Sequence, residues 1–187
     1  MSKSQFFNNI AARNRNTEML IYLIGYMGAG KTTYGKRLAR DINYNFIDLD
    51  QKIEAEQGKT IAEIFAEKGE DGFRQIEREA MMQTFGLENT IVATGGGTPC
   101  FFDNMQQLNA HGATLYIEMT PKSLVWNLMN SHKDRPLLHN KTYEELVDYI
   151  DATLQKRLPF YTQARYKVDG IGITSQKMID ALYDCKL

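Results

Sequence analysis

The sequence has little cysteine, no long apolar run and almost no net charge. Cys100 and Cys185 lie far apart and can form neither a disulfide framework nor a four-ligand zinc site on their own, which favours a reduced, cytoplasmic setting. No apolar run approaches the roughly 20 residues of a transmembrane helix, and the N-terminus lacks the apolar stretch of a secretory signal. The 22 Lys and Arg against 23 Asp and Glu give a net charge of −1, which argues against a nucleic-acid binder with a broad basic surface. Any anion that the protein binds is therefore held by a local site.

What the sequence does contain is enough apolar material for one core. At 187 residues with 43% hydrophobic residues, the chain predicts a single folded domain. Residues 1–18 are polar and predict a leader outside the domain, with a targeting peptide or an alternative start at Met19 as the other interpretations. The domain is then expected to cover residues 19–187.

Strand-like and helix-like segments alternate along this domain. Short β-rich runs predict strands at 20–24, 45–49, 90–94, 113–118 and 166–168. Caps and apolar periodicity predict helices at 31–42, 50–57, 104–110, 121–129 and 176–183, one starting after Thr60, one following a break at 69–72, and a long one after Thr142. This alternation indicates a three-layer α/β/α fold with a five-stranded parallel sheet, whose ligands bind just after residues 24, 48 and 94.

The segment after the first strand matches the phosphate-binding pattern G-x-x-x-x-G-K-[ST]. It reads Gly25-Tyr-Met-Gly-Ala-Gly-Lys-Thr32, between an apolar strand and a helix. Glycines let backbone N–H groups turn toward phosphate oxygens, and the helix N-terminus adds partial positive charge. Lys31 is expected to reach the β- and γ-phosphates and Thr32 to ligate Mg²⁺, so the segment predicts a nucleoside triphosphate site.

Two carboxylates follow the second strand. Asp48 and Asp50 are two residues apart, so on a strand they point the same way, toward the phosphate site. One can orient water around Mg²⁺ while the other accepts a proton from an attacking hydroxyl. The alternative is an ordinary helix N-cap, a role that Asp50 could fill.

Arginines and a glycine run form a third group of candidates. Arg74 lies three residues before Glu77, and Arg157 precedes Leu-Pro-Phe-Tyr161. Each offers a planar fork for a carboxylate, although a solvated helix pair or a surface residue is the alternative. Gly95–Gly97 follow the third strand and suit close approach of a small ligand to the backbone, or a plain loop.

A polar segment over residues 130–141 separates two predicted helices. It contains Lys133-Asp-Arg-Pro136 and has the length of many active-site lids. Arg135 could swing over the phosphates and stabilise the transferring charge, and a surface loop is the competing interpretation.

Together these segments resemble the shikimate kinase family. The resemblance rests on their order and spacing over about residues 19–169: Gly25–Thr33, Asp48-Leu-Asp50, Phe73-Arg-Gln-Ile-Glu77, Gly95–Gly97, Arg135-Pro-Leu-Leu138 and Arg157-Leu-Pro-Phe-Tyr161. It implies a P-loop fold like that of nucleoside monophosphate kinases, with a mobile lid. Small kinases of this type can work as monomers, so the resemblance also implies a monomer. It also implies transfer of the ATP γ-phosphate to the 3-hydroxyl of shikimate with Mg²⁺ as cofactor, a step of aromatic amino acid biosynthesis.

The resemblance also implies a role for each matching residue. Asp50 contacts the shikimate hydroxyls and is the candidate base, Asp48 supports Mg²⁺ through water, and Arg135 is the lid arginine. The residues implied to bind ATP are Gly28, Ala29, Gly30, Lys31, Thr32, Thr33 and Arg135. Those implied to bind shikimate are Asp50, Arg74 and Arg157 with the backbone of Gly96 and Gly97, and Phe65 and Phe73 as walls of the ring.

Two stretches depart from the family pattern. Many members carry an arginine early in the lid, where this chain reads Trp126-Asn-Leu-Met129, and a basic residue in the adenine-contacting loop, here Asp169-Gly-Ile-Gly-Ile-Thr174. We therefore expect nucleotide affinity or adenine selectivity to differ.

Two other functions remain open at this stage. A related kinase of polyhydroxy acids, such as gluconate kinase, is the alternative among enzymes, and a nucleotide-binding regulatory module is the alternative outside them. Phe73-Arg74, Gly95–Gly97 and Arg157 favour shikimate over gluconate, and the presence of both Lys31 and Asp50 speaks against a module that does not catalyse.

Overall fold

The computed structural model describes residues 19–131 and 141–183. The predicted leader of residues 1–18, Arg135 and most of the predicted lid at 130–141 lie outside these residues. Within them, no helix is long and apolar enough to cross a membrane.

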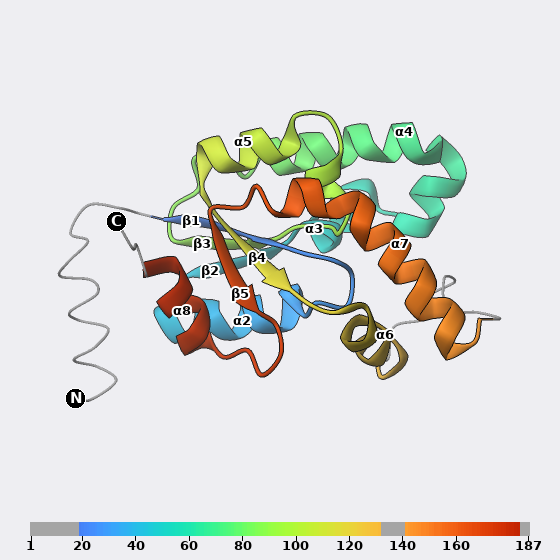
Figure 1. The fold of residues 1–187 in the computed structure, drawn as a ribbon. Coiled ribbons are helices and arrows are strands. Elements are labelled where there is room, and N and C mark those ends of the chain that lie inside the picture. The colour runs from blue at the N-terminus through green and yellow to red at the C-terminus, as the bar shows by residue number, and fades with distance from the viewer. Residues whose placement is uncertain (1–18, 132–140, 184–187) are drawn as a thin grey trace.

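Five parallel strands form one sheet, in the order β2-β3-β1-β4-β5 (Figure 1). Their bounds are β1 Leu20–Ile24, β2 Asn45–Asp48, β3 Thr90–Ala93, β4 Ala113–Glu118 and β5 Tyr166–Asp169. Every residue of the central strand β1 is buried, as expected of a parallel sheet covered on both faces. The predicted five-stranded parallel sheet is confirmed.

Helices cover both faces of this sheet. Their bounds are α2 Lys31–Ile42, α3 Leu49–Gln57, α4 Ile61–Met82, α5 Asn104–His111, α6 Pro121–Met129, α7 Tyr143–Tyr161 and α8 Ser175–Tyr183, with a short 3₁₀ helix η1 at Thr98–Cys100. Figure 1 shows α2 and α8 on one face and α4, α5 and the end of α7 on the other. The three-layer prediction is therefore confirmed, with the loops after β1, β2 and β3 at one edge of the sheet.

Several predicted bounds differ by one residue from the structure, and two local differences bear on the site. The second strand ends at Asp48 rather than at residue 49, because the Asp48 carboxylate accepts from the amide of Gln51 and so starts α3. The expected break at 69–72 is confined to Gly69, whose φ of 69° kinks α4 while the helix resumes at the next residue. Arg74 lies five residues after this kink, in the second part of α4.

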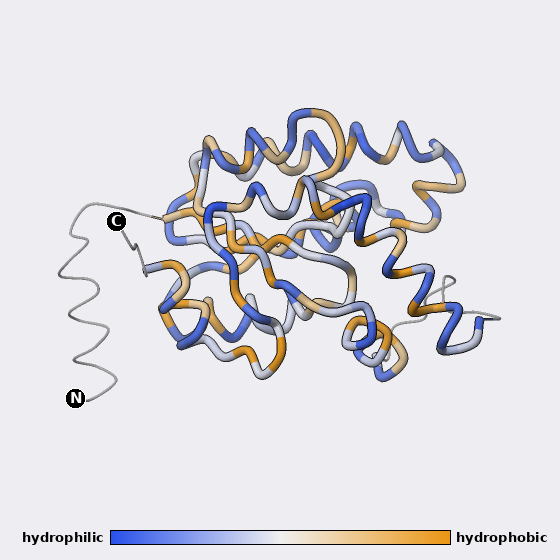
Figure 2. Tube along the Cα trace, in the orientation of Figure 1, coloured by the Kyte–Doolittle hydropathy of each residue, from blue (hydrophilic) through white to orange (hydrophobic). Residues whose placement is uncertain are grey.

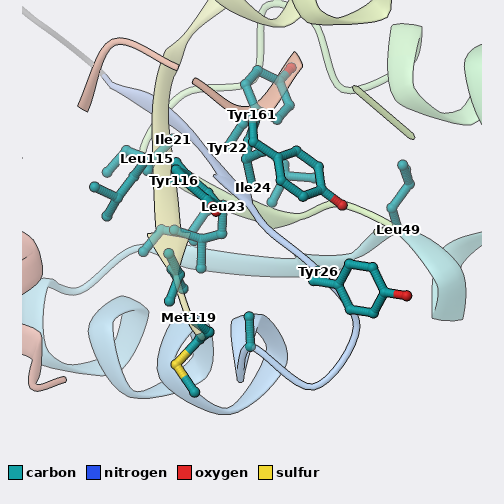
Figure 3. Packing of buried hydrophobic residues seen from close by; sticks show 14 of the residues in the cluster. Ile21, Tyr22, Leu23, Ile24, Tyr26, Leu49, Leu115, Tyr116, Met119 and Tyr161 are labelled. Atoms are coloured by element: carbon teal, nitrogen blue, oxygen red, sulfur yellow. The ribbon is translucent and has the colours of Figure 1, made fainter. Parts of the chain in front are cut away.

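The core lies between the sheet and its helices. Figure 3 shows Tyr22, Tyr116 and Tyr161 among the buried aliphatic side chains, and Figure 2 shows the apolar stretches of the chain running through the central strands. The hydroxyl of Tyr22 shares a 2.8 Å hydrogen bond with that of Thr84, and burial raises the pKa of Tyr22 to about 12. This packing on both faces fixes the strand ends from which the functional loops emerge.

Candidate active site

The loop between β1 and α2 wraps around its own lysine. Lys31 Nζ donates to the carbonyl oxygens of Gly25 at 2.6 Å and Tyr26 at 2.9 Å. Gly30 precedes α2 with a φ of 83°, and a Cβ on it would lie within 2.6 Å of the Tyr34 ring. Among the described residues no side chain caps α2, and its first turn carries no acid. The helix thus offers backbone N–H groups and positive potential to an anion.

Two oxygen-bearing side chains meet beside this helix start. The Thr32 hydroxyl donates to Asp48 Oδ2 at 2.6 Å, while the other Asp48 oxygen caps α3. Asp50 lies in the first turn of α3, whereas Asp48 ends β2. The prediction that both carboxylates point the same way because they share one strand is therefore wrong. Both nevertheless line one cavity. Here Asp48 is the N-cap residue, a role for which the sequence had suggested Asp50.

That cavity has a volume of about 620 Å³, within the range of small-molecule sites. Its lining comes from the loops after β1, β2 and β3 and from the end of α6: Met27, Gly28, Gly30, Lys31, Thr32, Thr33, Tyr34, Lys36, Asp48, Asp50, Gln51, Thr94, Gly96, Asn127, Asn130 and Ser131. The structure thereby brings eight of the candidate residues into one space. Ala29 is buried behind it.

Arg74 lies on α4 in a closely packed setting. Its Nη1 donates to Glu77 Oε2 at 2.8 Å, and Glu77 is only 1% exposed. The interpretation of this pair as a solvated helix pair is therefore wrong. Nη2 donates to Glu70 at 3.2 Å, whereas Nε is buried and has no hydrogen-bond partner among the described residues. A guanidinium so placed keeps a free donor for a further acceptor.

Aromatic rings surround this guanidinium. Its carbon lies 4.0 Å from the centre of the Phe101 ring and 5.1 Å from that of Phe73. The rings of Phe65 and Phe73 stack with their centroids 4.4 Å apart. Such contacts hold a cation by its faces and leave its edge available for hydrogen bonds.

Arg157 approaches from α7. Its guanidinium carbon is 5.0 Å from the centre of the Tyr26 ring, and its Nη1 is buried without a hydrogen-bond partner among the described residues. Tyr161, one helical turn later, donates from its hydroxyl to the Gly96 carbonyl at 2.6 Å. Burial raises the pKa of Tyr161 above its ordinary value, so this hydroxyl remains a donor. The interpretation of Arg157 as a surface residue is wrong.

The two arginines flank consecutive glycines. A Cβ on Gly96 would lie 3.4 Å from Arg157 Nη1, and one on Gly97 would lie 2.8 Å from Arg74 Nη1. The Gly95–Gly97 loop thus lies between two cations, and Gly96 together with Asp50 lines the cavity described above.

We expect Gly97→Ala to raise the KM for a carboxylate substrate about tenfold. The backbone of Gly97 has a φ of −90° that alanine accepts, so the main effect is displacement of the Arg74 guanidinium by the new methyl group. A tenfold loss corresponds to about 1.4 kcal/mol, close to one charge-assisted hydrogen bond. Steady-state kinetics with each substrate varied in turn check this, and an unchanged KM for the acceptor would contradict it.

Comparison with known proteins decides the family. The shikimate kinase family model matches residues 27–185. The chain belongs to the shikimate kinase family. As a member it is an ATP-dependent small-molecule kinase with a P-loop. In this chain the P-loop is the segment Gly25–Thr32, in agreement with the loop geometry around Lys31.

Individual relatives agree with this assignment. The chain is 48% identical over 164 residues to a shikimate kinase of Phocaeicola vulgatus, covering 88% of this chain and 94% of the relative. A crystal structure of the shikimate kinase from Bacteroides thetaiotaomicron has a TM-score of 0.81 at 43% identity, covering 88% and 94% of the two chains. A structure of the enzyme from Acinetobacter baumannii, in complex with shikimate, has a TM-score of 0.79 at 30% identity and covers 95% and 99%.

A likeness to another kinase concerns the fold only. A gluconokinase from Sinorhizobium meliloti has a TM-score of 0.56 at 14% identity, covering 90% of this chain and 91% of its own. The sequence motifs had already favoured shikimate over gluconate, and the family match points the same way.

Sequence reasoning missed several residues of this site. Phe101 and Tyr26, which lie against the two guanidinium groups, and Tyr161, which holds Gly96, were not singled out. Tyr161 could have been found, because it lies four residues after Arg157 on a predicted helix and so on the same face. Phe101 gives no such signal, since it reaches Arg74 only through the turn after η1.

Proposed function

We propose that this member of the family transfers the γ-phosphate of ATP to the 3-hydroxyl of shikimate with Asp50 as general base. The observation that carries the proposal is the pair of guanidinium groups, each with a buried N–H that lacks a partner among the described residues, on either side of Gly96–Gly97 and next to the P-loop cavity. One carboxylate and several hydroxyls on a small ring match this combination of cations, backbone and carboxylate.

At the nucleotide end, the backbone of Gly28–Thr33 surrounds the phosphates. Lys31 is proposed to exchange the carbonyl oxygens of Gly25 and Tyr26 for phosphate oxygens, since Lys31 also lines the cavity. This places the γ-phosphate between the P-loop and Asp50.

A magnesium ion fits the oxygen donors beside that loop. The Thr32 hydroxyl and Asp48, 2.6 Å apart, are the residues proposed to hold it, Thr32 directly and Asp48 through water. Bound there, the ion neutralises charge on the phosphates. The carboxylate and hydroxyl of this pair are the hard ligands that Mg²⁺ prefers.

At the acceptor end, Arg74 and Arg157 are proposed to grip the carboxylate of shikimate. Phe65 and Phe73 wall the ring, and the backbone of Gly96 and Gly97 meets the ring hydroxyls. The free Arg74 Nε and Arg157 Nη1 support this placement, because a buried donor without an acceptor is costly and a ligand carboxylate supplies one.

The chemical step then needs little beyond positioning. Asp50 accepts the proton of the 3-hydroxyl while the oxygen of that hydroxyl forms a bond to the γ-phosphorus. The bond between the γ-phosphorus and the oxygen that bridges it to the β-phosphate breaks, which releases ADP. Lys31 lowers the cost of the charge that develops on the transferred group. Arg135 is proposed to add to this from the lid and belongs to the part of the chain outside the described residues.

A coupled ADP-release assay with a panel of hydroxy acids tests the proposal. ADP release is expected with shikimate and not with gluconate. Gluconate is included because a gluconate kinase was the alternative enzyme considered from the sequence. Turnover with gluconate and none with shikimate would overturn the acceptor assignment. Nucleotide binding without turnover on any acceptor would favour the regulatory module.

A further inference from the structure

The guanidinium group of Arg74 is held by two hydrogen bonds and by one close aromatic ring. Its Nη1 and Nη2 donate to Glu77 and Glu70, which both lie on α4, so these bonds stay within one helix. The ring comes from elsewhere, because Phe101 lies in the turn after η1 and its centre is 4.0 Å from the guanidinium carbon. At this distance the ring is in van der Waals contact with the planar cation and restricts how the cation can rotate.

Phe101 differs from the two other rings near Arg74 in how it is packed. Phe73 belongs to the apolar core and Phe65 packs against it, whereas Phe101 does neither in the part of the chain that the structure describes. The Phe101 ring is nevertheless the nearest of the three, since the ring centre of Phe73 is 5.1 Å and that of Phe65 is 5.8 Å from the same carbon. Core packing therefore does not account for the contact between Phe101 and Arg74.

The turn that carries Phe101 has an unusual backbone. The next residue, Phe102, has a φ of 52°, in the left-handed region that bulky side chains rarely adopt. The side chain of Phe102 is 58% exposed, so burial of its ring does not offset this conformation. Backbone strain of this kind persists where the surrounding structure fixes it, and it is concentrated at functional sites.

Arg78, on α4, fixes this turn. Its Nη1 pairs with Asp103 Oδ1 at 2.5 Å and donates to Asn104 Oδ1 at 2.7 Å. Asn104 is fully buried and donates from Nδ2 to the carbonyl of Thr98 at 2.9 Å. The segment that contains Phe101 is therefore held on both sides, at η1 and at the start of α5.

Thr98 connects the same turn to the carboxylate beside Arg74. Its hydroxyl donates to Glu77 Oε1 at 2.5 Å, while Glu77 Oε2 accepts from Arg74 Nη1. Thr98 and Glu77 are both buried. The turn thus acts on Arg74 in two places, on its face through the Phe101 ring and on one edge through Glu77.

We propose that Phe101 is a positioning residue for the acceptor, which orients Arg74 so that its free Nε–H faces the carboxylate of the substrate. This rests on the proposed function, in which Arg74 binds that carboxylate. The ring needs no contact with the substrate, and Arg78, one helical turn after Arg74, keeps the ring in place. A guanidinium that is free to rotate binds more weakly, because its orientation has to be fixed each time the substrate binds.

Phe101→Leu tests this proposal, because leucine keeps an apolar side chain and removes the flat ring. We expect the KM for shikimate to rise about 3- to 30-fold, the range for one cation–π contact, with kcat and the KM for ATP unchanged. Phe101→Tyr keeps the ring and should restore most of the affinity. Phe102→Leu is the matched control, since its ring lies 5.2 Å from the Arg78 guanidinium carbon, and it should keep the KM of the parent. An unchanged KM in Phe101→Leu, or an equal rise in Phe102→Leu, would overturn the proposal.

A substrate analogue shows whether the effect passes through Arg74. The methyl ester of shikimate lacks the negative charge that Arg74 is proposed to bind, so Phe101→Leu should leave the affinity for the ester, measured as an acceptor or as a competitive inhibitor, unchanged. In an Arg74→Lys background no planar guanidinium remains to be oriented, and Phe101→Leu should have no further effect. Equal losses of affinity for the acid and the ester, or a full additional loss in the lysine background, would contradict the role of Phe101.

The parent enzyme separates this inference from the proposed function. If the parent releases no ADP with shikimate, the proposed function and this inference fail together. Turnover by the parent with an unchanged KM in Phe101→Leu would overturn this inference alone. Thermal unfolding shows whether each variant is folded, and Phe101→Met, which also lacks a ring, replaces the leucine variant if that one does not fold.

Discussion

Replacement of Asp50 by asparagine is expected to reduce kcat by about 10²–10⁴, the range for loss of a general base. The change keeps the size of the side chain, removes its negative charge and takes away its ability to accept the proton of the acceptor hydroxyl. Because Asp50 lines the cavity from the first turn of α3, where Asp48 provides the cap, the variant leaves the cap of α3 intact. Steady-state ADP release at saturating ATP and shikimate measures the effect.

The matched control for this experiment is Asp151→Asn. Asp151 is an exposed carboxylate on α7, so its replacement changes the net charge by the same amount without touching the cavity. The control should keep the parent kcat. A kcat for Asp50→Asn within threefold of the parent would remove Asp50 from the role of base.

Replacement of Arg157 by alanine is expected to weaken shikimate binding by roughly 2–5 kcal/mol, as when one partner of a buried charge pair is lost. This corresponds to a rise in KM of about 30- to 5000-fold. The KM for ATP should change far less, because the buried Nη1 of Arg157 is proposed to bind the carboxylate of shikimate and not the nucleotide. Arg157→Lys keeps the charge without the planar fork and should fall between the parent and the alanine variant.

Lys156→Ala is the control for charge on the same helix. Lys156 precedes Arg157 and is exposed, so its loss should leave both KM values near those of the parent. Equal losses of affinity for ATP and shikimate in Arg157→Ala would contradict its assignment to the carboxylate. Thermal unfolding of each variant separates a binding effect from a loss of folded protein.

The fold was predictable because local signals agree with one another. The capping boxes at Thr60 and Thr142 are present as expected. In each, the threonine side chain accepts from the backbone amide of the glutamate three residues later, and that glutamate side chain accepts from the threonine amide. The boundary at Asp48 was misplaced because an aspartate can end a strand and cap a helix equally well, and only the bond to the Gln51 amide decides between them. At Gly69 the expected break is present as a kink at one non-helical residue, with helix on both sides of it.

The sequence predicts which motifs belong to the site, but it does not predict the contacts that their side chains make. Sequence spacing brings Lys31, Asp50 and Gly96 to one edge of the sheet, since the ends of parallel strands meet there. The burial of Glu77 and the ring of Phe101 on Arg74 arise from contacts between α4 and the turn after η1, which no local pattern encodes.

Gly96 lies between the loop proposed to bind ATP and the arginine proposed to bind shikimate, so we expect it to couple the binding of the two substrates. A Cβ on this glycine would lie 3.1 Å from the Met27 amide nitrogen of the P-loop and 3.4 Å from Arg157 Nη1, and its carbonyl accepts from Tyr161. We therefore expect a shift of Arg157 or Tyr161 on binding of a carboxylate to reach the backbone that is proposed to bind phosphate, because Gly96 contacts both. Coupling free energy is reciprocal, so a factor by which shikimate tightens ATP binding must equal the factor by which ATP tightens shikimate binding. A single synergism constant, measured from either side, would then describe how strongly each substrate favours the binding of the other.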